Sequence, residues 1–353
     1  MLCKHLCPDT DFLHLMSALM TERETMMEEK QPNNKTVDVI IPVYKPNETL
    51  SRLLKRLGKQ SYPIKKIIVI NTEKSYWKDG EYDHMENLEV HHVTKEEFDH
   101  GGTRNQGAGY SNADVMVFMT DDAVPADRHL IGALVKGLDQ TGEHGEPVVQ
   151  AYARQLPNPD CGLAEQYTRS FNYPDQSRVK TKADLPELGI KTFFASNVCC
   201  AYDREVYMKN GGFTKRTIFN EDMIYAGNAV RHRGQAVAYV AEAKVYHSHN
   251  YGCMTQFHRN FDLAVSQADH PEVFEGIRSE SEGIRLVKKT CSWLAKQKKY
   301  WLIPGVIIKS GFKYLGYLMG KRYTSLPKWL ILKCTMNQTY WKKDPVFDRQ
   351  ISN

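Results

Sequence analysis

Residues Val37–Tyr44, VDVIIPVY, form an almost unbroken apolar run in which β-branched side chains dominate. A strand with water on one face would alternate apolar and polar residues, so this run predicts a strand that is covered on both faces. Strands of this kind occur in parallel sheets that carry helices on both sides. The run therefore predicts an α/β fold.

The segments that follow alternate as a parallel sheet requires. Residues 47–61 have leucines at helical spacing and a glycine near the end, and residues 65–71 form a second buried strand. A short strand is predicted at 88–94, a helix that begins with glycines at 101–114, and a fourth strand at 115–120. The pattern predicts an open, mixed, mainly parallel sheet flanked by helices, and such sheets bind ligands at the carboxyl ends of their strands.

The second half of the chain mixes strands and helices and then becomes helical. Residues 147–155 and 196–213 suggest strands and a helix, residues 220–234 predict a helix, and residues 235–251 predict a strand that ends in two histidines. Helical patterns dominate from about residue 262. We expect three parts: a polar lead-in with a helical pattern at 1–35, an α/β domain at 36–262 and a basic helical region at 263–353.

The composition argues against several classes of protein. A net charge of +5 over 353 residues is mildly basic and does not suggest a nucleic-acid partner. The eight cysteines contain no CxxC pair, which argues against a disulfide framework and a zinc-ligand set. Together with an N-terminus that lacks a signal-peptide pattern, the cysteines predict a reducing, cytoplasmic setting.

The most apolar C-terminal segment, residues 301–323, is interrupted by Lys309 and Lys313. Its aromatic and basic residues favour a helix that lies at a membrane surface over one that crosses the bilayer. From Lys288 to Lys343 the chain is rich in lysine and poor in acids. Two interpretations remain open: helices that pack on the domain with their lysines toward water, or peripheral contact with anionic headgroups.

Two adjacent carboxylates, Asp121 and Asp122, follow the fourth predicted strand in the sequence MTDDAVPAD. Neighbouring carboxylates repel each other and are costly to desolvate, so a bound cation would supply the positive charge that they need. A solvated turn is the alternative. The position at the carboxyl end of a strand favours the cation site.

Several segments together resemble the family 2 glycosyltransferases, which have the GT-A fold and use nucleotide-sugar donors. In family order they are VIIPVY with the helix and strand that follow, TDDAVP, GGF, NED and HSH, and the likeness extends from about Val37 to Trp341. The segments EFDHGGTRNQGA and GKRYTSLPKWLILKCTMNQTYW more narrowly resemble the bacterial rhamnosyltransferase branch. The resemblance implies a GT-A domain with a nucleotide-sugar half to about residue 125, an acceptor half after it, and a C-terminal helical extension.

The resemblance also implies a metal site. Asp122 corresponds to the last acid of the family's DxD motif, which holds a divalent cation, Mn or Mg, on the donor diphosphate. This chain departs from the motif, because Thr120 occupies the first acidic place. In similar enzymes a late histidine reaches the metal or the diphosphate, so His247 is the second predicted ligand and His249 is assigned to the sugar or the acceptor. A structural role for either histidine stays open.

The sequence Asn220-Glu221-Asp222 resembles the family's ED motif. A displacement with inversion needs a base that takes the proton of the acceptor hydroxyl. The resemblance assigns this role to Asp222, with Glu221 as its catalytic neighbour and acceptor contact. Taken alone, the two acids would be explained by the first turn of a helix, where the helix dipole favours negative charge.

Other positions complete the predicted donor and acceptor sites. Paired glycines permit close approach of the backbone, an amide can bind a base or ribose, and an arginine can reach a phosphate. Taken singly, most of these positions are also explained by turns or by surface polar residues. The predicted nucleotide contacts are Pro42, Val43, Tyr44, Asn71, Asp99, Gly101, Gly102, Arg104, Asn105, Asp121 and Asp122, and the predicted sugar or acceptor contacts are Gln150, Arg154, Asn197, Gly211, Gly212 and His249.

These assignments predict an inverting, metal-dependent glycosyltransferase in the cytoplasm, at the inner face of the cell membrane. We expect it to move L-rhamnose from dTDP-L-rhamnose to a hydroxyl of a cell-surface polysaccharide or a lipid-linked glycan precursor. One alternative is a UDP-hexose donor. Another is a non-catalytic relative that binds glycan or nucleotide, although Asp122, Glu221 and Asp222 are all present. A nucleotidyltransferase is remoter, since PVYKPNETL does not fit its phosphate loop.

Overall fold

The computed structural model describes residues 35–277 and 280–342. The chain divides into two compact units, residues 1–35 and 36–353, and every described helix and strand belongs to the second. The helix predicted within the lead-in lies outside the described residues. Among the described residues, no helix has both the length and the apolar character needed to cross a bilayer.

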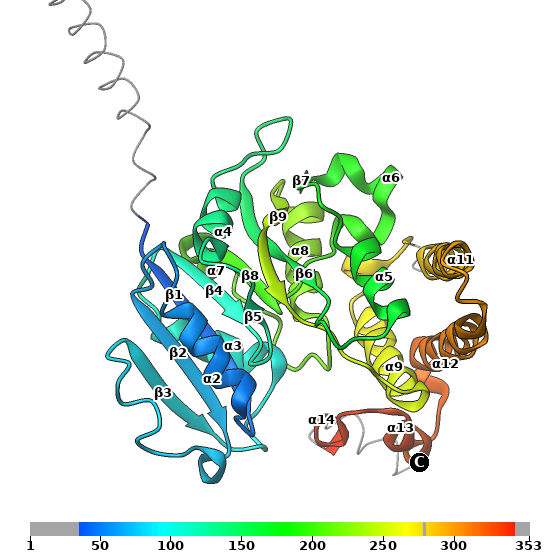
Figure 1. Ribbon diagram of the computed structural model, residues 1–353, viewed down its shortest axis with the longest axis horizontal. Coiled ribbons are helices and arrows are strands. Elements are labelled where there is room, and N and C mark those ends of the chain that lie inside the picture. Colours follow the sequence, from blue (N-terminus) through cyan, green and yellow to red (C-terminus); the bar gives the residue numbers. More distant parts are fainter. Residues whose placement is uncertain (1–34, 278–279, 343–353) are drawn as a thin grey trace, which may run out of the picture. The chain divides into compact units, whose positions relative to one another are not determined.

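A mixed sheet of nine strands forms the centre of the second unit (Figure 1). Its first half is parallel and has the order β3 (Leu88–Val93), β2 (Lys66–Thr72), β1 (Val37–Tyr44) and β4 (Val115–Met119). Seven of the eight residues of β1 are buried or nearly so, because strands lie on both sides of it and helices cover both faces. The strand order thus accounts for the apolar run with which β1 is built.

The second half of the sheet changes direction. The strand β8 (Cys199–Asp203) runs antiparallel to β4 and to β6 (Val148–Leu156), and β6 is parallel to β9 (Ala236–Tyr246). The short strands β5 (Val124–Pro125) and β7 (Arg178–Lys180) pair antiparallel with β9. As a consequence, the carboxyl ends of β1, β2, β4, β6 and β9 meet the amino end of β8 at one edge of the sheet.

Helices α2 (Glu48–Leu57) and α4 (Leu130–Leu138) pack on one face of the sheet. The side chain of Asn47 accepts a hydrogen bond of 2.8 Å from the amide of Thr49, which satisfies a donor that the first helical turn of α2 leaves free. The leucines of α2 lie at helical spacing and are buried against β1, β2 and β4. The amphipathic pattern read from the sequence is therefore the one that covers the sheet.

The other face carries α3 (His100–Tyr110), α7 (Arg204–Lys209) and α8 (Glu221–His232). Its core is rich in aromatic side chains, and the rings of Phe118 and Phe213 have centroids 5.2 Å apart. Tyr202 belongs to this aromatic core, and its hydroxyl donates to Asn197 at the sheet edge over 2.8 Å.

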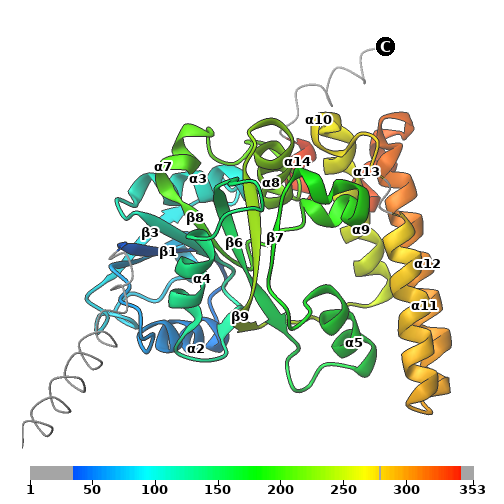
Figure 2. The same cartoon turned by 90° about the horizontal axis from the view of Figure 1, so that it is seen from above.

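Helix α9 (Cys253–Asp269) passes through residue 262, where the sequence suggested a boundary, and packs along α12 (Ile303–Lys321). The contact needs glycine: an added Cβ at Gly316 would lie 2.2 Å from the carbonyl oxygen of Phe257. Figure 2 shows α12 and α11 (Glu280–Lys296) side by side at the border of the unit. The remaining helices are α5 (Leu163–Asn172), α6 (Leu185–Leu188), α10 (Pro271–Phe274), α13 (Lys328–Cys334) and α14 (Gln338–Lys342), and the 3₁₀ turns are Lys74–Tyr76, Lys182–Asp184, Gly189–Thr192, Tyr300–Leu302 and Tyr323–Ser325.

The predicted order of strands and helices is confirmed from β1 through β4, and the mixed sheet with a helical C-terminal extension is confirmed as the fold. The short strand β5 and the helix α4, which follow β4, were not predicted. The sequence analysis did not predict α5, β7 and α6. These three elements lie between residues 156 and 195, where short elements alternate with turns and no period extends long enough to be recognised.

Candidate active site

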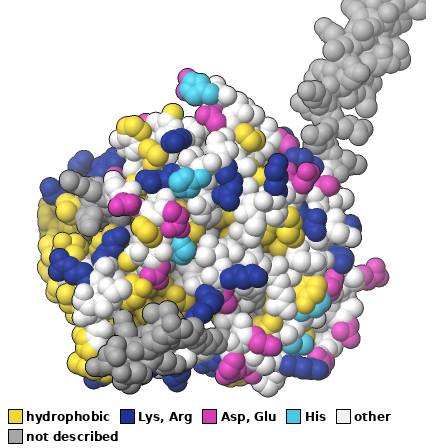
Figure 3. All heavy atoms as spheres, turned by 180° about the vertical axis from the view of Figure 1, so that it is seen from behind, with side chains coloured by type: hydrophobic (Ala, Val, Ile, Leu, Met, Phe, Trp, Pro, Cys, Tyr) yellow, Lys and Arg dark blue, Asp and Glu magenta, His cyan; other side chains and the backbone are white. Residues whose placement is uncertain are grey.

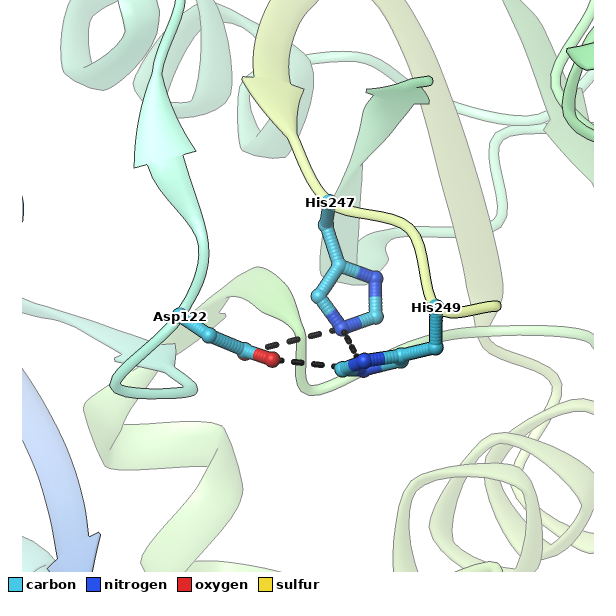
Figure 4. A group of neighbouring side chains, drawn as sticks. All are labelled: Asp122, His247 and His249. Atoms are coloured by element: carbon cyan, nitrogen blue, oxygen red, sulfur yellow. Dashed lines mark hydrogen bonds and ion pairs between the residues drawn. The ribbon is translucent and has the colours of Figure 1, made fainter. Parts of the chain in front are cut away.

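A carboxylate and two imidazoles meet at the sheet edge (Figure 4). Asp122 comes from the turn after β4, and His247 and His249 follow β9 directly. Asp122 Oδ1 lies 3.5 Å from His247 Nε2, and Asp122 Oδ2 lies 3.2 Å from His249 Nε2. The two Nε2 atoms are 3.0 Å apart. Two segments more than a hundred residues apart therefore point three metal-binding atoms at one place.

The orientation of His247 is fixed from behind by Gln155 of β6. The Oε1 atom of Gln155 accepts a hydrogen bond from Arg169, which has only donors, so this end of the amide is the oxygen. His247 Nδ1 lies 2.9 Å from the same oxygen and must therefore carry its proton. The Nε2 atom, which faces Asp122, keeps its lone pair.

Both histidines are held in the neutral form. Burial is the largest effect that lowers the pKa of His247 and His249, although the nearby Asp122 carboxylate opposes it. Neutral imidazole is the form that binds a metal. The ring of Tyr251 stacks on His249 with centroids 4.7 Å apart, which restricts the second ring as Gln155 restricts the first.

The neighbouring carboxylate Asp121 is mostly withdrawn from water. Its Oδ2 atom lies 3.4 Å from the amide of Tyr44. Burial, followed by the charge of Asp122, raises the pKa of Asp121 to about 6. Thr120, which stands where the family carries an acid, donates from Oγ1 to Asp122 Oδ1 over 2.8 Å. Thr120 thus orients the carboxylate that faces the histidines.

The donor set fits a divalent cation. The three ligand atoms of Asp122, His247 and His249 all lie within 4.8 Å of one another, and a carboxylate with two imidazoles suits Mn²⁺ better than Mg²⁺, which prefers oxygen. A cation there would also compensate the charge that Asp121 and Asp122 share. His249, which the sequence assigned to the sugar, is placed by the structure with the two predicted metal ligands.

The second acidic pair begins helix α8. Asn220, which precedes it, has a left-handed backbone with φ of 63°, and its side chain donates to Ser266 Oγ over 2.8 Å. Asp222 accepts hydrogen bonds of 2.8 Å from the amides of Asn197 and Met223. Its carboxylate is thus held at the surface of the sheet edge, where the residue remains partly exposed.

Glu221 and Asp222 have opposite protonation behaviour. Burial, followed by the charge of Glu221, raises the pKa of Asp222 to about 7. Burial also acts on Glu221, but the nearby Arg104 and His100 outweigh it and lower the pKa of Glu221. Arg104 Nη1 lies 3.2 Å from Glu221 Oε1. Glu221 is therefore committed to a buried ion pair, whereas Asp222 has the pKa of a general base near neutral pH.

A chain of buried hydrogen bonds supports the acidic pair. Asn197 Nδ2 donates to Glu221 Oε1 over 3.0 Å, and its Oδ1 accepts from the hydroxyl of Tyr202 over 2.8 Å. Gln150 Nε2 donates to the same hydroxyl over 2.6 Å. Gln150 is completely buried, so the structure corrects its assignment: it supports Asn197 and has no surface for a sugar. Asn197 uses its backbone and its side chain to hold both acids.

The glycines of the predicted walls bring α3 against the GGF segment. An added Cβ at Gly101 would lie 2.1 Å from the carbonyl oxygen of Thr214, and one at Gly212 would lie 2.6 Å from Asn105 Oδ1. Gly212 also has φ of 69°, which favours glycine. Asn105 donates to the carbonyl of Phe213 over 2.8 Å. These residues set how closely α3 approaches the GGF segment.

Three further predicted residues have defined places in or near these walls. Asp99 caps α3 and accepts a hydrogen bond from the amide of Gly102. Gly211 has φ of 88° and forms the turn that leads into Gly212. Arg154 lies on β6 immediately before Gln155 and is partly exposed. Their contacts with donor or acceptor stay predictions.

The ends of β1 and β2 form the other side of the site. Pro42 and Val43 lie within β1, while Tyr44 at its end is 43% exposed. Asn71 is completely buried; its Nδ2 donates to the carbonyl of Glu73 over 3.0 Å. Its Oδ1 has no hydrogen-bond partner within the part of the chain that the structure describes. The Oδ1 atom is therefore an acceptor that the described residues leave unpaired inside the sheet edge, and Asn71, like Gln150, has no exposed surface in this structure.

Sequence reasoning missed four residues of the site. Gln155 and Arg169 orient His247, and neither belongs to a motif. Tyr76 lies edge-on to Tyr44 with ring centroids 5.6 Å apart, and Lys45 Nζ lies 5.2 Å from both rings. Gln155 could have been suspected, because it ends the strand beside the one that leads to the histidines. The other three come from segments whose pairing the sequence does not reveal.

Comparison with known proteins identifies the family of the chain. Residues 38–211 match the family described as Glycosyl transferase family 2. The chain is 36% identical over 311 residues to the O-antigen chain rhamnosyltransferase RfbN of Salmonella typhimurium, a span that covers 86% of this chain and 96% of that protein. The chain belongs to the family 2 glycosyltransferases.

Two further comparisons extend the assignment. The glycosyltransferase is 36% identical over 253 residues to the O-antigen chain rhamnosyltransferase WbaN of Salmonella anatum, which covers 70% of this chain and 78% of that one. Its fold is similar to that of mannosyltransferase PcManGT from Pyrobaculum calidifontis, solved with GDP-Man and Mn²⁺, with a TM-score of 0.50, 14% identity and coverage of 93% and 95%. The predictions of the GT-A fold, the family and the enzyme class are confirmed.

Proposed function

We propose that this glycosyltransferase moves L-rhamnose from dTDP-L-rhamnose, with inversion, to a hydroxyl of a growing cell-surface polysaccharide or of its lipid-linked precursor. The observation that carries the proposal is the 36% identity, over 86% of the chain, to a protein named as an O-antigen chain rhamnosyltransferase. The intact carboxylate–histidine cluster and the intact acidic pair support catalysis over a binding role.

Asp222 is the general base in this proposal. Its carboxylate takes the proton of the acceptor hydroxyl while the hydroxyl oxygen attacks the anomeric carbon and the bond from that carbon to the nucleoside diphosphate breaks. The pKa of about 7 keeps a useful fraction of Asp222 ionised at neutral pH and gives it the strength to hold the proton. Glu221 is held by Arg104 and raises the pKa of Asp222 through its charge.

Asp122, His247 and His249 would hold the divalent cation, Mn²⁺ in preference to Mg²⁺. When bound, the cation offsets the negative charge that develops on the departing diphosphate. Gln155 keeps His247 in the tautomer that can bind it, and Thr120 orients Asp122. Asp121 lies one residue away and contributes charge at the same place.

A base at the ends of β1 and β2 would lie beside Tyr44 and near the buried amide of Asn71. The Oδ1 atom of Asn71 is unpaired among the described residues but fully buried, so a hydrogen bond from N3 of thymine or of uracil would require a rearrangement that exposes it. Tyr44, exposed beside Tyr76, offers an aromatic surface at the same end of the sheet. These residues do not distinguish dTDP from UDP, so a UDP-hexose donor stays the alternative that the experiment must separate.

We also propose that the enzyme works in the cytoplasm, at the inner face of the cell membrane, and that its C-terminal region makes the contact. All six cysteines that the structure describes are free thiols, which agrees with a reducing compartment. The basic and aromatic C-terminal helices agree with a membrane contact.

The test is the release of nucleoside diphosphate by purified protein. We would incubate it with dTDP-L-rhamnose, UDP-glucose, UDP-galactose or UDP-N-acetylglucosamine, each with Mn²⁺ or with a chelator. We expect metal-dependent release from dTDP-L-rhamnose alone. The release should be lost in Asp222→Asn and retained in the matched control Glu205→Gln, which changes an exposed acid in the first turn of α7. Release only from a UDP-sugar would overturn the rhamnose assignment and leave the mechanism.

A further inference from the structure

Helix α12 exposes an apolar strip to the surroundings. Ile307 and Ile308 are 55% and 56% exposed, and Tyr314 and Leu315, two helical turns later on the same side, are 53% and 51% exposed. The preceding turn adds Trp301, which is 68% exposed. We call these five residues, together with Tyr300 in the same turn, the outer strip.

A packed surface helix normally buries its large apolar side chains, whereas α12 exposes them in the outer strip. The side of α12 that contacts α9 consists of Gly316, Tyr317 and Gly320, which are buried, while the larger aliphatic residues face away from the protein. Figure 3 shows hydrophobic side chains gathered at the edge of the unit that the C-terminal helices form. Scattered exposed apolar residues are normal, but a continuous strip of this kind marks a binding surface.

Cations lie before and after the outer strip, and the segment that carries it contains no acid. From residue 283 to residue 342 the sequence contains thirteen Lys and Arg and no Asp or Glu. Lys296 and Lys298 lie exposed before the strip, and Lys321 and Arg322 lie exposed after it. The surface therefore offers apolar side chains to a layer of hydrocarbon and positive charge to a layer of anions.

Resting on the proposed function, we infer that the outer strip inserts into the surface of an anionic phospholipid membrane, with α12 lying in the plane of the interface. Tryptophan and tyrosine at the border of a strip are suited to the depth of the headgroups, and flanking lysines bind acidic lipids. The outer strip thus makes the membrane contact, and the side of the enzyme that carries it faces the lipid.

A second copy of this chain is a poorer occupant. In a symmetric dimer the same patch would face itself, so the cations at both ends of the strip would be brought together without an acid to pair with them. Anionic headgroups supply the charge that such a dimer lacks. The charge pattern therefore decides between two occupants that the apolar side chains alone would not separate.

The inserted helix would orient the active site. Helix α9 begins four residues after His249 and packs along α12 through the close contacts of Gly316 and Gly320. The membrane face and the histidine cluster are thus joined by one helix. An acceptor anchored in the same membrane would meet the sheet edge at a fixed height, which is what a lipid-linked acceptor requires.

The experiment is flotation of the full chain with vesicles. One set contains phosphatidylcholine alone, and the other contains equal parts of phosphatidylcholine and phosphatidylglycerol. The variant Ile308→Glu/Leu315→Glu places acids in the outer strip, and Met208→Glu makes the same change at an exposed methionine of α7. We expect wild type and Met208→Glu to float with anionic vesicles, and the double variant to lose about tenfold or more in partitioning.

Fluorescence quenching is a second readout, and it does not require an acidic substitution in the outer strip. Lipids brominated near the headgroup should quench the fluorescence of Trp301, and Trp301→Phe should remove that part of the quenching. Wild type that stays unbound, or a double variant that floats equally well, would overturn the inference. So would a dimer that dissociates in the double variant while wild type ignores vesicles.

Failure of the inference and failure of the proposed function are distinguishable. Donor hydrolysis in the absence of lipid tests only the catalytic site, and the double variant should release nucleotide at the wild-type rate. Vesicle binding with no release from any donor would refute the proposed function and leave the outer strip as a membrane surface. Release from dTDP-L-rhamnose without vesicle binding would refute the membrane inference and leave the proposed function.

Discussion

Two pairs of adjacent acids lie at the same edge of the sheet, and their surroundings give them different chemical roles. Asp121-Asp122 faces two neutral histidines and has no cationic side chain in hydrogen-bond contact among the described residues. Glu221-Asp222 has an arginine against one member and backbone amides against the other. The first pair is arranged for an added cation, and the second divides its charge into one fixed anion and one base.

The difference shows that the role of two adjacent acids cannot be read from their own sequence. In both pairs burial makes the charge costly. What separates them is whether the compensating charge comes from the chain, as with Arg104, or must come from a ligand, as with Asp122. The predictions below alter one pair at a time.

The largest effect is expected from Asp222→Asn. The amide cannot accept the acceptor's proton, so turnover should fall by about a thousandfold, while the two backbone hydrogen bonds to the side chain can partly persist. The measurement is sugar transfer under saturating donor, with Glu205→Gln as the control of equal charge. Turnover within a few-fold of wild type would remove Asp222 from the role of base.

Metal removal should be the next largest effect. Chelation should lower transfer by about a hundredfold or more, because the charge on the leaving diphosphate is then uncompensated. Titration back with Mn²⁺ should restore activity at lower concentration than Mg²⁺, since two of the three ligands are imidazoles. Equal activity in chelator would mean that the cluster of Asp122, His247 and His249 serves another purpose.

A smaller effect is expected one layer behind the cluster, at Gln155. In Gln155→Leu the Nδ1 proton of His247 loses its acceptor, so the affinity for Mn²⁺ should fall by about ten- to a hundredfold. Gln155→Glu keeps an acceptor for both His247 and Arg169 and should recover most of it. Electron paramagnetic resonance of Mn²⁺ measures this without turnover. Equal affinities in all three proteins would show that Gln155 only packs.

The smallest effect is a shift in pH dependence. Asp222 must be ionised to act, and its pKa is raised to about 7, so kcat/KM should fall about tenfold for each pH unit below that value. The charge of Glu221 contributes to this rise, so Glu221→Gln should move the acidic limb to lower pH. A limb that stays in place would show that the two carboxyl groups of the second pair do not interact.

The sequence predicted what depends on local pattern. The apolar run of β1 and the leucine spacing of α2 can be read from the sequence, and these are the side chains that the fold buries. The acids and histidines follow strands, so their meeting at one edge could be expected. Gln150 could not be placed, because its role depends on Tyr202 and Asn197, which reach it through the antiparallel strand β8.

The partners of the two acidic pairs could be predicted from the sequence only in part: a metal on Asp122 and His247 was expected, whereas the arginine beside Glu221 was not. Arg104 was expected to reach a phosphate, yet its guanidinium lies against Glu221, which is more than a hundred residues away in the chain. His249 was assigned to the sugar, because alternation alone does not say which of two histidines turns toward Asp122. Both outcomes depend on how loops fold at the sheet edge, and loops carry little periodic signal.

The most direct test of the difference between the two pairs is Mn²⁺ binding by wild type, Asp122→Asn and Asp222→Asn, followed by electron paramagnetic resonance alongside sugar transfer. We predict that Asp222→Asn binds Mn²⁺ as wild type does and fails to transfer sugar, while Asp122→Asn loses both. Normal Mn²⁺ binding in Asp122→Asn, or its loss in Asp222→Asn, would contradict the assignment of the cation to the first pair and of the base to the second.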